Sequence, residues 1–215
     1  MNSLCTVLML VVAITGDDKK ASRWDFEDAT VGKLPANWTA AKTGEGEGSV
    51  WKVIEDATAP KGKKALAQTA ANGGSGVFNL CVADKTSFRD LDLSVAFKAI
   101  DGKKDQGGGP VWRYQDAKNY YVVRMNPLED NFRLYKVVDG KRIQLATTKD
   151  DVVAANGKWH TIRVVHQGNH IQCFFNGKLH LDAKDDTFKE AGKIGVWTKA
   201  DAQTAFDALV IGEPK

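Results

Sequence analysis

DQGGGPVWRYQDAKNYYVVRMN, residues Asp105–Asn126, places three glycines and a proline directly before closely spaced aromatic residues and arginines. Such a glycine-rich segment is typical of a loop, and apolar residues at every second position indicate β-strands with one buried face. By this period Tyr121, Val123 and Met125 share one face of a strand, and the residues between them share the other. The stretch therefore predicts a loop and then paired strands, with one face available for something other than the core.

The same alternation recurs through the rest of the chain. In LDLSVAFKA, residues 91–99, every second residue is apolar, as in a half-buried strand. The dipeptides Asp139-Gly140, Gly168-Asn169 and Asn176-Gly177 separate alternating runs, and such pairs tolerate the positive φ angles of hairpin turns. No segment has a long helical period. We therefore predict an all-β fold, a two-sheet antiparallel jelly-roll sandwich.

Length and composition are those of an ordinary globular protein. The chain has 215 residues, of which 43% are hydrophobic and 27% charged, which suits one domain with a sizeable core. The formal net charge is +3, and the basic residues do not gather into a stripe. This pattern argues against a nucleic-acid partner.

The N-terminus resembles an export signal. Leu4–Ile14 is an apolar run too short to span a bilayer comfortably, but it suits the central region of a signal peptide. We predict a signal peptide over residues 1–16, cleaved between Ala13 and Gly16, and a single β-sandwich domain over 17–215. The mature protein would then be extracytoplasmic, periplasmic or secreted, and not an integral membrane protein. A buried N-terminal strand or a short membrane anchor is the alternative, because the first residues lack lysine and arginine.

Cleavage would remove Cys5 and leave Cys81 and Cys173. In GVFNLCV the alternation places Cys81 opposite the apolar face, whereas in HIQCFFN it places Cys173 on the apolar face. A disulfide needs two Cβ atoms that nearly touch. We therefore predict two free thiols.

Arginines repeat on one face of the central strands. The alternation puts Arg113, Arg124 and Arg133 on the non-core face of three consecutive strands. Like charges opposite one another destabilise a sheet, so they need acidic partners such as Glu129 or Asp130, or a ligand with many oxygens. The guanidinium fork suits hydroxyl and carboxylate groups. The alternative is an ordinary solvated face.

A tryptophan shares its face with a lysine near the C-terminus. In GKIGVWTKADAQ, Trp197 and Lys199 alternate with aliphatic residues, and Asp201 follows the strand. An indole on a polar face is a good platform for a sugar ring, although a neighbouring loop could instead cover it. His160, His166 and His170 have no carboxylate at metal-ligand spacing, so we interpret them as structural or surface residues.

Three long segments carry a resemblance to a known family. Residues 105–142 (DQGGGPVWRYQDAKNYYVVRMNPLEDNFRLYKVVDGKR), 157–188 (GKWHTIRVVHQGNHIQCFFNGKLHLDAKDDTF) and 192–212 (GKIGVWTKADAQTAFDALVIG) resemble the 3-keto-disaccharide hydrolase-like family. These are exported bacterial domains with a concanavalin A-like jelly roll, and WDFEDATVGKLPANW, residues 24–38, suits the opening strand of that fold. The resemblance implies a concave sheet that binds a carbohydrate or modified disaccharide. Some members act on 3-keto-glycosides.

A ketone at C3 of a sugar acidifies the neighbouring C–H, so the chemistry needs a base and an electrophile. Lys199 and Asp201 are the candidate catalytic residues. The candidate ligand-binding residues are Arg113, Tyr120, Arg124, Asn126, Arg133 and Trp197. The carboxylate pattern E-x-D-x-x-E of glycoside hydrolase family 16 does not occur, since DLDLS, residues 90–94, lacks both glutamates. We therefore predict no paired-carboxylate mechanism.

The resemblance also implies a calcium ion where the first and last strands meet. Asp25, Glu27 and Asp207 lie on those segments, and Ca²⁺ prefers carboxylate oxygens. The alternative is that these are solvated acids.

Three function classes follow from these observations. The first is an exported carbohydrate-active domain that binds a sugar on its concave face and acts on 3-keto-glycosides. The second is a non-catalytic carbohydrate-binding module, and the third is a laminin G-like protein-interaction domain. Arginine, tryptophan and lysine on one face favour the first two.

Overall fold

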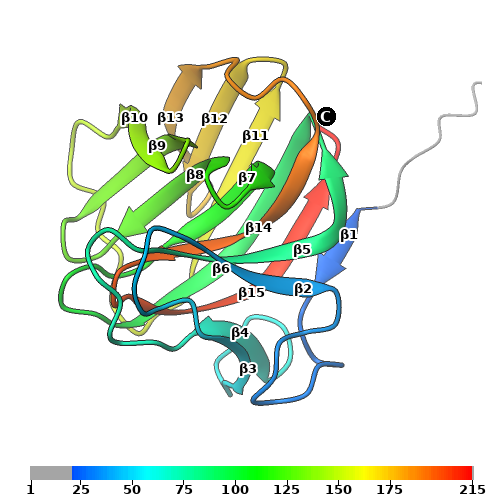
Figure 1. Ribbon diagram of the computed structural model, residues 1–215, viewed down its shortest axis with the longest axis vertical. Helices are drawn as coiled ribbons and strands as arrows, with labels where there is room; N and C mark the ends of the chain where they lie inside the picture. The colour runs from blue at the N-terminus through cyan, green and yellow to red at the C-terminus, as the bar shows by residue number, and fades with distance from the viewer. Residues whose placement is uncertain (1–20, 215) are drawn as a thin grey trace, which may run out of the picture.

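The computed structural model describes residues 21–214, which form fifteen β-strands in two sheets and no helix (Figure 1). The eight-stranded sheet has the order β13 (Lys178–Lys184), β12 (His170–Phe175), β11 (His160–Gln167), β6 (Leu91–Asp101), β15 (Gln203–Gly212), β4 (Lys64–Gln68), β3 (Trp51–Glu55), and β1 (Ser22–Trp24) also pairs with β15. The seven-stranded sheet has the order β10 (Lys141–Thr147), β9 (Asn131–Val138), β8 (Asn119–Asn126), β7 (Gly109–Asp116), β14 (Gly192–Lys199), β5 (Phe78–Phe88), β2 (Trp38–Thr43).

The prediction of an all-β, two-sheet antiparallel sandwich is confirmed. Neighbouring strands pair antiparallel in both sheets, and Figure 1 shows β7–β9 in green on one layer and β11–β13 in yellow and orange on the other. In residues 21–214 no helix is long and apolar enough to cross a membrane. The predicted signal peptide lies outside the described residues.

The main core fills the space between the two sheets. Tyr121, Val123 and Met125 of β8 lie in it, as their alternation predicts, and all three are fully buried. Both cysteines also lie in this core, and they are free thiols, as predicted. The expectation that Cys81 points away from the core is wrong, because the apolar residues that alternate with it occupy a second cluster on the other face.

This second cluster covers the outer face of the seven-stranded sheet. It consists of nine buried residues: Phe78, Leu80, Val82, Val111, Tyr120, Val122, Tyr135, Val137 and Trp197. Strand β8 shows the consequence, since every residue from Tyr120 to Asn126 is buried. The strands at the centre of this sheet are therefore apolar on both faces.

The outer face is buried because the sheet curls around it. The hydroxyl groups of Thr43 on β2 and Tyr120 on β8 lie 2.8 Å apart, although four strand steps separate these strands. In a flat sheet that separation would be about 19 Å. The Thr43 hydroxyl also donates to the carbonyl of Ala117 in the turn between β7 and β8. The outer face is thus concave, and its own side chains fill much of the hollow.

A β-bulge exchanges the two faces in the middle of β7. Its pairing with β8 shifts between Trp112 and Asp116, and Arg113 has a φ of 43°, in the left-handed region. A bulge places two residues opposite one and interrupts the alternation. Trp112 therefore faces the main core, whereas Tyr114 packs against the concave cluster, although the sequence pattern predicts one face for both. Gly192 permits the bulge, because a Cβ there would lie 2.5 Å from the Arg113 carbonyl carbon.

The glycines before β7 are required by close backbone contacts. A Cβ on Gly108 would lie 2.2 Å from the carbonyl oxygen of Trp197, and one on Gly109 would lie 2.0 Å from that of Val123. A real Cβ atom cannot approach a backbone oxygen so closely. Only glycine therefore fits at these two positions, where the chain passes between β14 and β8. This explains why the glycine run stands directly before bulky residues.

His166 links the two sheets inside the main core. It is fully buried on β11, and its Nδ1 accepts a 2.9 Å hydrogen bond from the Trp112 indole nitrogen on β7. Burial, together with the positive charge of Arg113, lowers the pKa of His166 to about 3. The sequence interpretation of His166 as a structural histidine agrees with this environment.

We expect His166 to make the protein sensitive to acid. The unfolded chain protonates this imidazole below about pH 6.5, whereas the folded state keeps it neutral until about pH 3. The contribution of His166 to the free energy of unfolding is therefore complete above pH 6.5 and is lost as the pH falls toward 3. At pH 5 the loss is about 2 kcal/mol. His166→Asn removes the titration and keeps an acceptor for the indole. Urea unfolding from pH 8 to 4.5 should show a flatter pH profile for the variant, and identical profiles would contradict the assignment.

Candidate functional site

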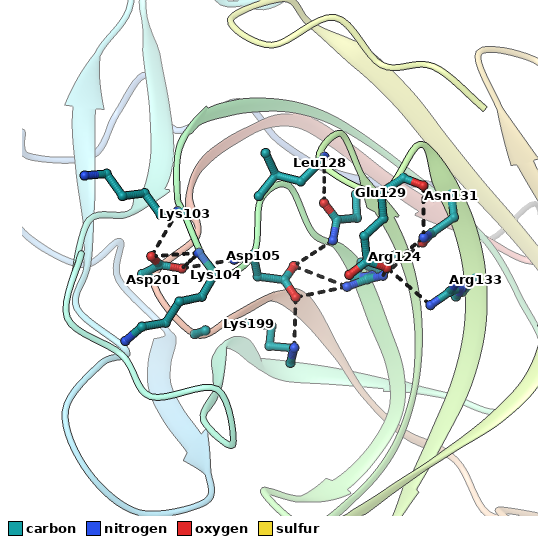
Figure 2. Close-up of polar contacts among 12 residues, drawn as sticks. Lys103, Lys104, Asp105, Arg124, Leu128, Glu129, Asn131, Arg133, Lys199 and Asp201 are labelled. Atoms are coloured by element: carbon teal, nitrogen blue, oxygen red, sulfur yellow. Dashed lines mark hydrogen bonds and ion pairs between the residues drawn. The ribbon is translucent and has the colours of Figure 1, made fainter. Parts of the chain in front are cut away.

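The candidate site begins with the loop between β6 and β7. The Asp201 carboxylate accepts the backbone N–H groups of Lys103 at 3.0 Å, Lys104 at 3.0 Å and Asp105 at 3.1 Å (Figure 2). These bonds lower the pKa of Asp201 against the opposing effect of its burial. Asp201 thus shapes the loop that carries Asp105 onto the concave face.

Asp105 stands at the centre of a network of ionic and polar contacts. Its Oδ2 lies 3.0 Å from Nη1 of Arg124 and 3.0 Å from Nζ of Lys199, and its Oδ1 accepts from the Asn126 amide at 3.3 Å. The side chains of Asp105 and Arg124 are both 1% exposed, so this pair is removed from water. Figure 2 shows the three segments meeting: the loop, β8 and β14.

The network continues to the start of β9. Nη2 of Arg124 lies 3.0 Å from Glu129 and donates to Oδ1 of Asn131 at 2.9 Å. Glu129 also contacts Nη1 of Arg133 at 3.3 Å. Arg124 and Arg133 are direct partners in the pairing of β8 with β9, so Glu129 offsets the repulsion of two like charges. We call Asp105, Arg124, Asn126, Glu129, Asn131, Arg133 and Lys199 the Asp105 cluster.

The two acids of the cluster have opposite electrostatic properties. Burial raises the pKa of Asp105, although Arg124 and Lys199 oppose that shift. Burial also acts to raise the pKa of Glu129, but its hydrogen bond from Asn131 and the charge of Arg124 outweigh this and lower it. Only Glu129 is substantially exposed, at 42% of its side chain. It is the carboxylate of the cluster that a ligand can reach.

Arg142 of β10 adjoins this cluster and lies over the aromatic part of the concave face. The carbon at the centre of its guanidinium lies 4.4 Å from the ring centroid of Tyr135 and 5.3 Å from that of Phe78. Phe78 stands on β5, five strand steps from β10, which is a second sign of the curl of the sheet. Asp105 and Glu129 are close enough to affect the pKa of Arg142, which burial lowers.

Two guanidinium nitrogens at the site are buried and have no hydrogen-bond partner within residues 21–214. They are Nε of Arg124 and Nη1 of Arg142. Buried donors are nearly always satisfied in folded proteins, by protein, water or a ligand. The concave face therefore contains unused donor capacity beside its aromatic residues.

The structure brings four of the eight predicted catalytic and ligand-binding residues into the Asp105 cluster: Arg124, Asn126, Arg133 and Lys199. Asp201 adjoins the cluster, but it is buried and its carboxylate accepts three backbone N–H groups of the loop. Tyr120 and Trp197 face the same hollow but are fully buried. The Trp197 indole donates to the Tyr120 hydroxyl at 3.3 Å and packs 5.4 Å from Phe78, so the expected exposed indole platform is not found.

Arg113 lies elsewhere. The bulge turns its side chain away from the concave face, and its guanidinium donates to the carbonyl oxygens of Arg89 at 2.7 Å, Phe188 at 2.7 Å and Gly168 at 2.8 Å. The expectation that Arg113 lines the same surface as Arg124 is therefore corrected. Arg113 connects three loops at the other end of β7.

The expected calcium ligands already bind backbone amides. Glu27 accepts the N–H of Lys63 at 2.8 Å, Asp207 that of Lys61 at 2.7 Å, and Asp25 that of Glu27 at 3.2 Å. In the described part of the chain, no group of three or more His, Cys, Asp or Glu side chains is arranged to hold a metal ion. Burial and the neighbouring acids raise the pKa of Asp207 to about 6. The structure therefore gives Glu27 and Asp207 a role in holding the 61–63 loop.

Sequence reasoning missed the residues that organise the site. Asp105 and Asn131 lie in or beside turns, where alternation carries no information about direction. Arg142 reaches the concave face only through the curl of the sheet. Glu129 was identified as an acidic partner for the arginines, and the structure confirms that contact.

Comparisons with known proteins identify the class of fold. The carbohydrate-binding module CBM66 from Bacillus subtilis matches with a TM-score of 0.65 and 19% identity, over 83% of this chain and 96% of that one. The cellulose-induced protein Cip1 matches with a TM-score of 0.64 and 12% identity, over 90% and 97%. Domain 4 of AbnA, a GH43 extracellular arabinanase from Geobacillus stearothermophilus solved with arabinotriose, matches with a TM-score of 0.57 and 14% identity, over 89% and 91%. The chain is a jelly-roll β-sandwich of the kind found in lectins and carbohydrate-binding modules.

The family comparison is more specific than the comparison of folds. Residues 25–211 match the model of the 3-keto-alpha-glucoside-1,2-lyase-like domain, and the chain belongs to this family. No curated protein matched significantly.

Proposed function

We propose that the protein binds a carbohydrate on the concave face of the seven-stranded sheet and acts on 3-keto-glycosides there. The observation that supports this most is the Asp105 cluster, where charged groups and unpaired donors lie beside aromatic side chains on one face of the sheet. Guanidinium and ammonium groups suit the oxygens of a sugar, and the buried aromatic cluster packs beside them. The family of the chain adds the substrate class.

The proposed chemistry is an elimination followed by hydration. A base removes the C2 proton next to the C3 ketone, the C1–O bond breaks, and the departing oxygen takes a proton, which leaves a double bond between C1 and C2. Water then adds to this double bond, its hydroxyl going to C1. The ammonium of Lys199, held by Asp105, would donate to the ketone oxygen, where negative charge develops. Glu129, the exposed carboxylate of the cluster, would act as the base in place of Asp201.

Lys199→Met should reduce turnover of a nitrophenyl 3-keto-glucoside by about 100- to 1,000-fold, the usual cost of losing one donor to a developing oxyanion. Release of nitrophenol measures the rate. Lys189→Met is the matched control, because Lys189 is 70% exposed and forms a surface ion pair with Asp186. Equal rates in the two variants would contradict the role of Lys199.

A non-catalytic carbohydrate-binding module is the second candidate. It is favoured by the engagement of Asp201 with backbone amides, which leaves a single exposed carboxylate at the site. In that case the keto-glucoside would bind without nitrophenol release, as calorimetry would show. Neither binding nor turnover across a glycan and keto-sugar panel at millimolar concentration would refute both carbohydrate functions and favour a protein-interaction domain.

A further inference from the structure

We propose that the carbohydrate bound at the concave face carries an anionic group, a carboxylate as in a sugar acid, which contacts Lys199, Arg133 and Arg142. This inference rests on the proposed function and specifies the ligand of the same site. It is argued from two features of the site, an excess of positive charge and two guanidinium N–H donors that lack a hydrogen-bond partner in the described part of the chain.

The Asp105 cluster and Arg142 together carry more positive than negative charge. The cations of the Asp105 cluster and its neighbour are Arg124, Arg133, Arg142 and Lys199, and the carboxylates are Asp105 and Glu129. The loop between β6 and β7 does not neutralise this excess of positive charge, since Lys103 and Lys104 add two cations against the one carboxylate of Asp201. A neutral sugar would leave this excess in place, whereas an anionic sugar would neutralise part of it.

The hydrogen bonds point in the same direction. Arg124 is 1% exposed and already shares Asp105 and Glu129 with other cations, yet its Nε has no hydrogen-bond partner in the described part of the chain. Nη1 of Arg142 is also unpaired, and this guanidinium has no carboxylate within ion-pair distance among the described contacts of the site. An arginine over aromatic rings, with a free donor, is suited to a planar acceptor such as a carboxylate.

A ligand can reach the edge of this network. The side chains of Lys199 and Arg133 are 17% and 34% exposed, and Glu129, which Arg133 contacts, is 42% exposed. Arg142 is partly buried and lies over Tyr135. A sugar that approaches from solvent would therefore contact these cationic side chains first.

The test compares matched neutral and acidic sugars by calorimetry. Glucose- and glucuronate-terminated disaccharides, with or without a 3-keto group, differ only at C6, and a 6-sulfated sugar separates carboxylate from general anion recognition. We expect the glucuronate to bind about 10- to 100-fold more tightly than the glucose compound, as for hydrogen bonds between charged partners. Raising the salt concentration from 50 to 500 mM should reduce this preference.

Arg142→Gln and Lys199→Gln should each remove most of the preference for the acidic sugar. Arg163→Gln is the matched control, because Arg163 also lies over an aromatic ring, 5.0 Å from Phe174, but on the eight-stranded sheet. Circular dichroism and thermal unfolding would confirm that each variant is folded, and Lys199, as the more exposed of the two, supplies the test if Arg142→Gln does not fold.

The outcomes separate this inference from the proposed function. Equal binding of neutral and acidic sugars would overturn the inference and leave the proposed function in place. Equal preference for sulfate and carboxylate would retain an anionic ligand and overturn the choice of carboxylate. Failure of every sugar to bind would overturn both.

Discussion

Replacing Asp105 with leucine should lower the free energy of unfolding by about 3–5 kcal/mol, because it leaves the buried guanidinium of Arg124 without its main counter-charge. Lys199 would lose its partner in the same change. Urea unfolding at pH 7 measures the loss. The size of this effect follows from burial, since both members of the pair are 1% exposed.

Two further variants make this test specific. In Asp105→Leu/Arg124→Met both charges are removed, so most of the stability should return, although each single substitution is costly. Asp92→Leu breaks the ion pair with Arg163, in which the two side chains are 24% and 44% exposed, and should cost at most about 1 kcal/mol. A loss at Asp105 no larger than at Asp92 would show that the buried network contributes little.

Trp197→Ala should also destabilise the fold, by about 3–5 kcal/mol, because it opens a cavity in the concave cluster. The indole is fully buried, contacts Phe78, and donates to the Tyr120 hydroxyl, which would lose this contact. Thermal and urea unfolding measure the change. Trp159→Ala is the control, since Trp159 is only partly buried and packs beneath Lys98 at the surface.

The same variant separates two roles for this tryptophan. If the indole were a sugar platform, Trp197→Ala would be nearly as stable as the wild type and would lose affinity directly. A large loss of stability, with sugar affinity measured at a temperature where the variant is still folded, would instead assign the indole to support of the site.

Part of the candidate site follows from alternation alone. The alternation of side chains places Arg124 and Arg133 on the outer face, and the two residues are direct partners in the pairing of β8 with β9. Lys199 has the same property on β14, and Phe78 is its partner on β5. These residues meet because regular strands preserve the alternation of side chains. Arg113 did not follow the pattern, since one extra residue at the bulge turned it away.

The sequence by itself determined the class of the fold. Period-two alternation and the glycine and asparagine turns specify short antiparallel strands, because they depend only on neighbouring residues. The side of β8 that faces the main core agrees with this local alternation. The family resemblance added the kind of ligand, which alternation cannot supply.

Only the tertiary structure decided which face carries the candidate site and which residues form its centre. The curl of the seven-stranded sheet, shown by the contact of Thr43 with Tyr120, buries residues whose alternation predicted exposure. Asp105 reaches Arg124 because Asp201, 96 positions along the chain, holds its loop. The curvature of the sheet and the anchoring of the loop arise from contacts between residues distant in sequence, so no local pattern encodes them. These contacts bury Asp105 and Arg124 together at the centre of the candidate site.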